Sequence, residues 1–362
     1  MYTEKIPLVS VIIPMFNAAR FIPQTLESLL VQTLKDFEVI IVDDCSTDKS
    51  VEVVENFMDA FAAQGIRLHL IESPTNAGAP SFPRNLGVQF SRGKYLAFLD
   101  NDDLFMPTAL EELVTLAENF STDVVNMPEI FWAEDNGSST DELLNPANHR
   151  VLNCRGFLRE PNEPSEEKIF VFPEDIGARV GLWLEKKFHW SAWASFCSRD
   201  FWIANQIKFP AMPVSDDTLT SFACLCFAGK ILSVPNIVYI QRQRADSISR
   251  GKDAAEKFIH KWLSNLILGF KNFDEIMGSV PFFSQHPDFR YAVLDWFFIR
   301  NISDAQRFPE IYAQIPVAVL NRFVEKEFSS DAAFAAYLFN TVNIQRLMIA
   351  ELRRELAEFQ KQ

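Results

Sequence analysis

The chain has 362 residues, is 48% hydrophobic and carries a formal net charge of −14. Its apolar content supports a large folded core, and its acidic balance argues against a general nucleic-acid binder, which needs a basic face. The sequence opens without a signal-peptide pattern and lacks the run of about 18 apolar residues that a membrane span needs. Its five scattered cysteines are typical of reduced thiols, so we expect a cytoplasmic protein.

Short β-branched runs alternate with amphipathic helical patterns through the first third of the chain. The first run is followed by Ile22, Leu26 and Leu29, whose spacing predicts a helix. Strands that are apolar on both faces and alternate with helices predict an α/β fold with a mainly parallel central sheet flanked by helices. We expect its strands at 8–13, 38–42, 67–73, 94–100 and 123–130.

The composition changes after this region. Residues 134–186 are polar, acidic and rich in proline, which predicts surface loops or a mobile insert, and periodic structure is expected to return near residue 187. We therefore expect one domain over 1–250, in which halves at about 7–130 and 187–250 enclose the insert. Residues 251–362 are predicted to form a largely helical C-terminal region.

Two predicted strands end in clusters of carboxylates. Asp43 and Asp44 follow the second strand, and Asp100, Asp102 and Asp103 follow the fourth. The carboxyl ends of parallel strands share one edge of a sheet, where such folds bind their ligands. Aspartates also cap helices and turns, so the alternative is that each cluster has only a local structural role.

Four stretches in this order carry a resemblance to a known family. They are "VSVIIPMFN", "VDDCSTD", "NAGAPSFPRNLG" and "YLAFLDNDD". Together they resemble the start of family 2 glycosyltransferases, which have the nucleotide-sugar-binding fold called GT-A. The resemblance is dense over about 7–130 and looser to about 250.

The resemblance implies a set of donor contacts. Asp44, together with Asp43, would accept a hydrogen bond from the base, which suits the ring N–H of uracil. Gly87 would permit close backbone packing. The remaining implied donor residues are Pro14, Phe16 and Asn17 around the uracil and ribose, and Arg84 and Asn85 near the nucleotide, with Arg84 reaching the pyrophosphate.

The triplet Asp100-Asn101-Asp102 looks like the DxD motif of this family. A diphosphate leaving group needs its developing charge neutralised, and a divalent ion held by one or two carboxylates does this. We expect Mn²⁺ or Mg²⁺ on Asp102, with Asp100 toward the ribose or a metal-bound water. Asp103 is expected to cap the helix that follows Pro107.

The second half is expected to supply the acceptor side. In "VSDDTLTSF", Asp217 matches the base of the family and Asp216 the acid before it, although either could simply cap the next helix. Trp190 and Trp193 could form an aromatic platform for a sugar or belong to the core. Arg242 and Arg244 resemble the late loop that closes over the donor, with exposed salt bridges as the alternative.

The C-terminal region leaves two questions open. Ile349, Leu352, Leu356 and Phe359 form a short apolar seam that suits either a homodimeric coiled coil or a helix docked on the body. The stripe of Lys, Phe, Trp and Leu at 257–273 suits either a core helix or contact with anionic lipid.

These expectations combine into a metal-dependent inverting transferase. It would move a sugar from a nucleotide-diphosphate sugar, most simply a UDP-sugar, to a glycan or lipid-linked acceptor in bacterial surface polysaccharide synthesis, for example of lipopolysaccharide or capsule. It would contact the inner membrane face only peripherally. The alternative is a non-catalytic relative that binds a nucleotide sugar or acts as a scaffold. A nucleotidyltransferase is disfavoured because "PMFNAARF" has no glycine.

Overall fold

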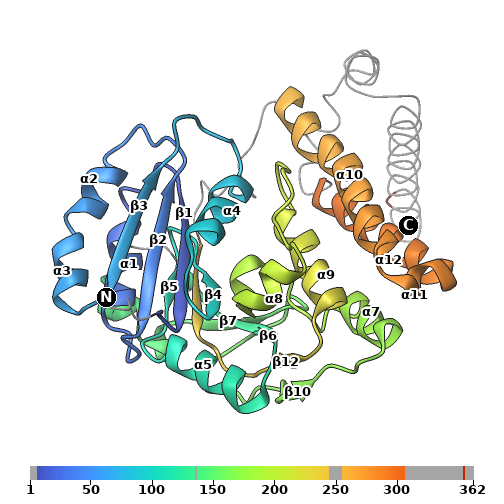
Figure 1. Cartoon of the computed structure of the whole chain (residues 1–362), viewed down its shortest axis with the longest axis horizontal. Coiled ribbons are helices and arrows are strands. Elements are labelled where there is room, and N and C mark those ends of the chain that lie inside the picture. The colour runs from blue at the N-terminus through green and yellow to red at the C-terminus, as the bar shows by residue number, and fades with distance from the viewer. Residues whose placement is uncertain (1–5, 135–136, 244–254, 306–353, 355–362) are drawn as a thin grey trace, which may run out of the picture. The chain divides into compact units, whose positions relative to one another are not determined.

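The computed structural model describes residues 6–134, 137–243 and 255–305, together with Arg354 (Figure 1). The chain divides into two compact units. The first comprises Met1–Gly251 and Glu275–Val293, and the second comprises Lys252–Asp274 and Leu294–Gln362.

An eight-stranded sheet forms the centre of the first unit. Its strand order is β10-β12-β6-β11-β4-β1-β2-β3. Neighbours among β1 to β4 pair in parallel, as do β6 and β12, whereas β11 runs antiparallel between β4 and β6. The strands are β1 Val9–Met15, β2 Phe37–Asp43, β3 Arg67–Glu72, β4 Tyr95–Phe98, β6 Val124–Asn126, β10 Phe170–Val171, β11 Ser195–Ser198 and β12 Ile231–Ser233.

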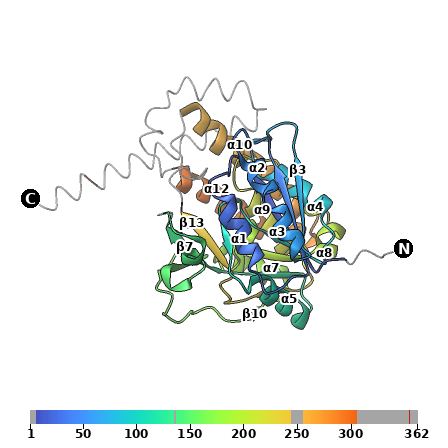
Figure 2. The same ribbon diagram turned by 90° about the vertical axis from the view of Figure 1, so that its left-hand side faces the viewer.

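A second sheet of five strands has the order β5-β13-β7-β8-β9. Its parallel pair, β7 and β13, brings segments together that lie about a hundred residues apart (Figure 2). Its strands are β5 Leu104–Phe105, β7 Glu129–Glu134, β8 Arg150–Asn153, β9 Leu158–Arg159 and β13 Tyr239–Gln243.

The helices of the first unit connect and cover these strands. They are α1 Ile22–Leu30, α2 Ser50–Glu55, α3 Met58–Ala63, α4 Ser81–Phe90, α5 Ala109–Phe120, α6 Thr140–Leu143, α7 Ile176–Leu184, α8 Arg199–Ala204, α9 Asp216–Phe227 and α11 Pro281–Gln285, with short 3₁₀ turns at Pro146–Asn148 and Ala192–Ala194. Helices α10, Ala255–Gly278, and α12, Pro287–Ala305, run through both units. In the part of the chain described, none of the helices is long and apolar enough to cross a membrane.

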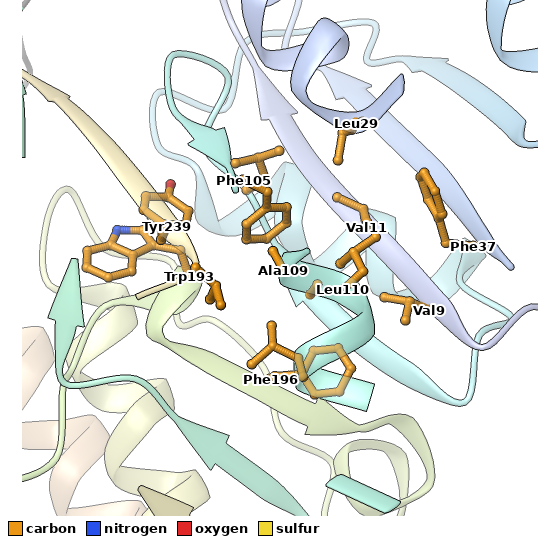
Figure 3. Close-up of a cluster of buried hydrophobic side chains, with 14 of the residues drawn as sticks. Val9, Val11, Leu29, Phe37, Phe105, Ala109, Leu110, Trp193, Phe196 and Tyr239 are labelled. Atoms are coloured by element: carbon orange, nitrogen blue, oxygen red, sulfur yellow. The ribbon is translucent and has the colours of Figure 1, made fainter. Parts of the chain in front are cut away.

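Strand β1 is buried on both faces because helices cover each of them. Val9 and Val11 point into the core cluster that also contains Leu29 of α1 (Figure 3). Side chains alternate along a strand, so Ile12 points to the other face, where α4 lies against β1 (Figure 1). A Cβ atom added at Gly87 would come 2.5 Å from Ile12 Cγ2, so this glycine permits the close approach that the sequence predicted.

Two expectations about the elements are wrong, and one correctly predicted strand is more exposed than expected. The stretch 123–130 is divided between two sheets, since Pro128 cannot donate to a ladder and Met127 N–H bonds instead to Ala194 O. Strand β3 is only partly buried, because it forms an edge of its sheet. The segment 134–186 is not merely loops: β8 and β9 extend the second sheet, and regular structure returns with α7 at Ile176.

The second unit shows close packing between its parts of α10 and α12. Gly269 lies against the ring of Phe297, and Asn265 Nδ2 donates to Asn301 Oδ1 at 2.9 Å. Leu266 and Phe273 are fully buried, which supports the core interpretation for these two residues of the 257–273 stripe. Residues 342–362, apart from Arg354, lie outside the described part of the chain, so the predicted seam is untested.

Candidate functional site

The carboxyl ends of β1, β2 and β4 bring the predicted donor residues to one edge of the central sheet. Met15 pairs with Asp43, so these two strands end side by side. Asp44 N–H donates to Met15 O at 2.7 Å. Asn101 Nδ2 donates to Pro14 O at 2.8 Å and so ties the loop after β4 to β1. The loops after the three strands therefore meet, as the topology of parallel strands requires.

Asn17 organises the loop after β1. Its backbone is left-handed, with φ of 48°, a conformation that asparagine tolerates better than most residues. Its Oδ1 accepts a hydrogen bond from Thr47 N–H at 2.8 Å, and its own N–H donates to Ser46 Oγ at 2.9 Å. Phe16, just before it, is 46% exposed. The asparagine thus fixes the loop, and Phe16 is left as an accessible aromatic face at the sheet edge.

The two aspartates after β2 have different surroundings. Asp43 is buried and accepts hydrogen bonds from the N–H and the hydroxyl of Ser46, so its carboxylate closes its own turn. Asp44 is also buried, and it accepts from Ala77 N–H, at 2.9 Å and 3.0 Å for its two oxygens. Since a carboxylate has about four acceptor positions, Asp44 can receive a further donor while this contact holds it in place.

Two side chains from the helices hold the DxD triplet, Arg84 of α4 and Thr25 of α1. Asp100 Oδ1 is 2.8 Å from an Nη of Arg84, and the main-chain O of Asn101 accepts from Thr25 Oγ1 at 3.1 Å. Asp102 is partly exposed at the end of this loop. Asp100 and Asn101 are partly exposed as well, so both carboxylates of the triplet can meet a ligand from solvent.

Asp103 does not cap the next helix. It is buried and accepts hydrogen bonds from Tyr239 Oη and from Arg242 N–H, each at 2.7 Å. The residue at the N-cap of α5 is Thr108. Burial raises the pKa of Asp103, and repulsion from Asp102 and Asp100 raises it further. Tyr239 was not among the predicted site residues, and its only signal in the sequence is its place before Arg242.

The oxygen donors at the DxD loop fit a hard divalent ion that arrives with a phosphate ligand. Among the described residues, no group of three or more His, Cys, Asp and Glu side chains is arranged to hold a metal. An ion at Asp102 would therefore need water and phosphate oxygens for the rest of its coordination shell, which is usual for Mg²⁺ at nucleotide sites. The crowding of Asp100, Asp102 and Asp103 favours a bound cation on charge grounds.

Asp216 and Asp217 form the first turn of α9. Neither is the N-cap, which is Ser215 in a left-handed conformation with φ of 65°. Negative charge at this end of a helix is favourable, because the helix dipole is positive there. Asp217 is partly exposed and borders a cavity of about 10 Å³ between Phe98, Trp202 and Phe209. A cavity of this size holds about one water molecule, so it is not a sugar-binding space.

Asp216 is buried and faces Arg84, whose Nη is 3.2 Å from Oδ2. Burial raises the pKa of Asp216 to about 7, with Arg84 opposing the shift and Asp217 adding to it. The same Arg84 guanidinium bonds Asp100, so one buried cation lies between the DxD loop and the first turn of α9. The family resemblance implied a contact between Arg84 and the pyrophosphate, and this bridge was not predicted.

Other predicted contact residues are held within the protein. Asn85 exchanges two hydrogen bonds with the backbone of Phe209, at 2.7 Å and 2.9 Å. Trp193 is buried and stacks on Tyr239 with ring centroids 4.5 Å apart, which favours the core alternative for it (Figure 3).

Trp190 is partly exposed and stacks on His189. Arg242 is buried, with its guanidinium 5.2 Å from the centre of the Phe21 ring. Arg244 lies outside the described residues.

Comparison with known proteins identifies the family. Residues 10–172 match the profile described as Glycosyl transferase family 2. The chain belongs to this family. It is 38% identical over 245 residues to the uncharacterized glycosyltransferase EpsJ of Bacillus subtilis, which covers 67% of this chain and 63% of the relative. It is 26% identical over 270 residues to glycosyltransferase GlyG of Streptococcus pneumoniae, covering 72% and 81%.

Solved structures confirm the GT-A fold of this family 2 chain. TarS 1–349 of S. aureus in complex with UDP-GlcNAc aligns with a TM-score of 0.53 at 19% identity, over 84% of this chain and 91% of that chain. The mannosyltransferase PcManGT of Pyrobaculum calidifontis in complex with GDP-Man and Mn²⁺ aligns with a TM-score of 0.50 at 16% identity, over 94% and 81%. At these identities the likeness shows the fold alone.

Proposed function

We propose that this protein is a metal-dependent inverting glycosyltransferase that uses a UDP-sugar. The observation that carries the proposal is the meeting of two groups of carboxylates at the ligand-binding edge of a GT-A sheet. The loops after β2 and β4 supply Asp44 and Asp102 there, and Arg84 connects the DxD loop to the acidic turn of α9. The structures of TarS with UDP-GlcNAc and of PcManGT with GDP-Man and Mn²⁺ support a nucleotide-sugar donor and a divalent ion.

On the donor side, Asp44 accepts the ring N–H of uracil while Ala77 N–H holds its orientation. Phe16 and Pro14 border the base and ribose. Asp102, with Asp100 beside it, would hold Mn²⁺ or Mg²⁺, and such an ion would neutralise charge on the diphosphate. These roles keep the reacting sugar at the sheet edge, next to the first turn of α9.

On the acceptor side, Asp217 takes the proton from the attacking hydroxyl. A single displacement at the anomeric carbon inverts its configuration and needs one such base. The new bond joins the acceptor oxygen to the anomeric carbon, and the bond to the diphosphate oxygen breaks, so UDP leaves with the electron pair. Trp190 is the better candidate for contact with an acceptor, because Trp193 is buried.

The proposed acceptor is a growing glycan or a lipid-linked saccharide of a bacterial surface polymer. The relative TarS is a poly(ribitol-phosphate) beta-N-acetylglucosaminyltransferase, which agrees with a role in such polymers. We place the reaction on the cytoplasmic side of the membrane, where a lipid-linked acceptor would bring the enzyme into peripheral contact.

The test is UDP release, with Mn²⁺ or Mg²⁺, across a panel of UDP-sugars. We expect the wild type to release UDP from at least one donor. Asp217→Asn keeps the size of the side chain but cannot act as a base, so turnover should fall by about 10² to 10⁴. UDP affinity should stay nearly unchanged. No UDP release from any donor by the wild type would refute the proposal and favour the non-catalytic alternative.

A further inference from the structure

Arg84 is the buried cation between the two halves of the candidate site. It lies on α4 and is 5% exposed. One Nη is 2.8 Å from Asp100 Oδ1, and the other is 3.2 Å from Asp216 Oδ2. These partners are separated from it by 16 and 132 residues along the chain. The planar fork of a guanidinium can hold two carboxylates at fixed positions, which a lysine ammonium cannot do in the same way.

The surroundings of Arg84 keep it from acting as an exposed phosphate ligand. Its guanidinium carbon lies 5.3 Å from the centre of the Phe209 ring. Phe209 is in turn fixed by its two backbone hydrogen bonds with Asn85, the residue next to Arg84. Two consecutive residues of α4 thus reach to the segment that leads into α9. Arg84 is therefore built into the protein, with each of its two terminal nitrogens bonded to a carboxylate.

The charges explain why the bridge matters. Asp100, Asp216 and Asp217 repel one another, and the first turn of α9 would move away from the DxD loop without a cation between them. Burial lowers the pKa of Arg84, but attraction to Asp100, Asp216 and Asp217 outweighs it, so the guanidinium stays charged. Removing one partner from a buried ion pair leaves an uncompensated charge, which is strongly unfavourable.

We propose that Arg84 is a positioning residue that fixes the base-bearing turn of α9 relative to the DxD loop, and that it does not bind the diphosphate. The inference rests on the proposed function, because it assigns the base to Asp217 and the ion to the DxD loop. Arg84 acts through Asp216 on the position of Asp217 and through Asp100 on the loop that would hold the ion.

The experiment compares Arg84→Gln, Arg84→Lys, Asp216→Asn and the double variant Arg84→Gln/Asp216→Asn with the wild type. Arg67→Gln, which removes an exposed arginine on β3, is the matched control for the loss of one arginine. Circular dichroism checks that each variant is folded. UDP affinity is measured by calorimetry with Mn²⁺, and kcat and KM are measured from UDP release.

We expect Arg84→Gln to lower kcat by about 10², the effect of a displacement of about 1 Å at a reacting group. UDP affinity should change by less than threefold. Arg84→Lys should recover only part of kcat, since one ammonium cannot hold both carboxylates. The double variant should lose less than the product of the two single losses, because both changes break the same contact.

Other outcomes refute the inference. A tenfold or greater loss of UDP affinity in Arg84→Gln with kcat unchanged would make Arg84 a diphosphate ligand. Losses that multiply in the double variant would show that Arg84 and Asp216 act independently. An inactive wild type would instead refute the proposed function, so the two failures are distinguishable. If every Arg84 variant is unfolded, unchanged kcat in folded Asp216→Asn would overturn the inference.

Discussion

At the scale of single residues, adjacent aspartates differ because their surroundings differ. Asp216 is buried against Arg84, whereas Asp217, the next residue in the first turn of α9, is partly exposed. The sequence could indicate that this pair matters, because two acids open a helix at the position expected for the base. It could not indicate which cation holds Asp216, since Arg84 lies 132 residues away and meets it only through the fold.

The raised pKa of Asp216 predicts a pH dependence of turnover. Asp216 faces Arg84 from α4, Asp100 from the loop after β4 and Asp217 on its own helix. As the pH falls below about 7, Asp216 gains a proton and loses the charge that attracts Arg84. We therefore expect kcat/KM to decline below about pH 7. Asp216→Asn is the comparison: if its pH profile keeps the same acidic limb, another group causes it.

The raised pKa of Asp216 also makes the free energy of unfolding depend on pH. The folded protein binds the Asp216 proton more tightly than the unfolded chain, whose ordinary pKa is 3.8. This contribution to stability is complete at low pH and is lost as the pH rises from about 4 to about 7. The free energy of unfolding of Asp216→Asn should lack this pH-dependent contribution. Chemical denaturation of the variant and the wild type at several pH values measures the difference.

At the scale of elements, glycine positions decide how closely helices approach the sheet. Gly87 of α4 faces Ile12 of β1, where an added Cβ would be 2.5 Å from Cγ2. Overpacking of this kind destabilises by about 1–3 kcal/mol and outweighs the gain in helix propensity of about 1 kcal/mol. We expect Gly87→Ala to lower the free energy of unfolding in chemical denaturation.

The matched control for this prediction is Gly181→Ala in α7. An added Cβ at Gly181 meets nothing within 4 Å. This variant should therefore be as stable as the wild type or gain up to about 1 kcal/mol from helix propensity. Equal stability of Gly87→Ala and Gly181→Ala would show that α4 moves away from β1 without loss.

Most elements of the nucleotide half could be predicted because their apolar periodicity is strong. The β1 and β2 runs are buried on both faces, as a covered parallel sheet requires. The errors have local causes. Pro128 divided one predicted strand between two sheets, and the short strands β8 and β9 are too polar to stand out in sequence. Their place in the second sheet depends on pairing with β7, a contact that no local pattern encodes.

At the scale of the whole molecule, the two units raise different questions. The first unit contains the candidate site, and the second contains close packing between α10 and α12. The apolar seam predicted at 342–362 would either join two copies of the chain or dock on the body of one. Truncation at about residue 340 should convert a dimer to a monomer in light scattering if the seam is intermolecular. An unchanged mass would favour docking.

Calorimetric titration of UDP, with and without Mn²⁺, measures whether the edge of the central sheet binds a nucleoside diphosphate together with a divalent ion. We expect the wild type to bind UDP more tightly with Mn²⁺, because an ion held by Asp102 would neutralise charge on the diphosphate. Asp102→Ala should lose this gain, whereas Asp44→Asn should weaken binding and keep the dependence on Mn²⁺. Absence of UDP binding to the wild type, or an affinity that neither Mn²⁺ nor Asp102→Ala changes, would contradict the account.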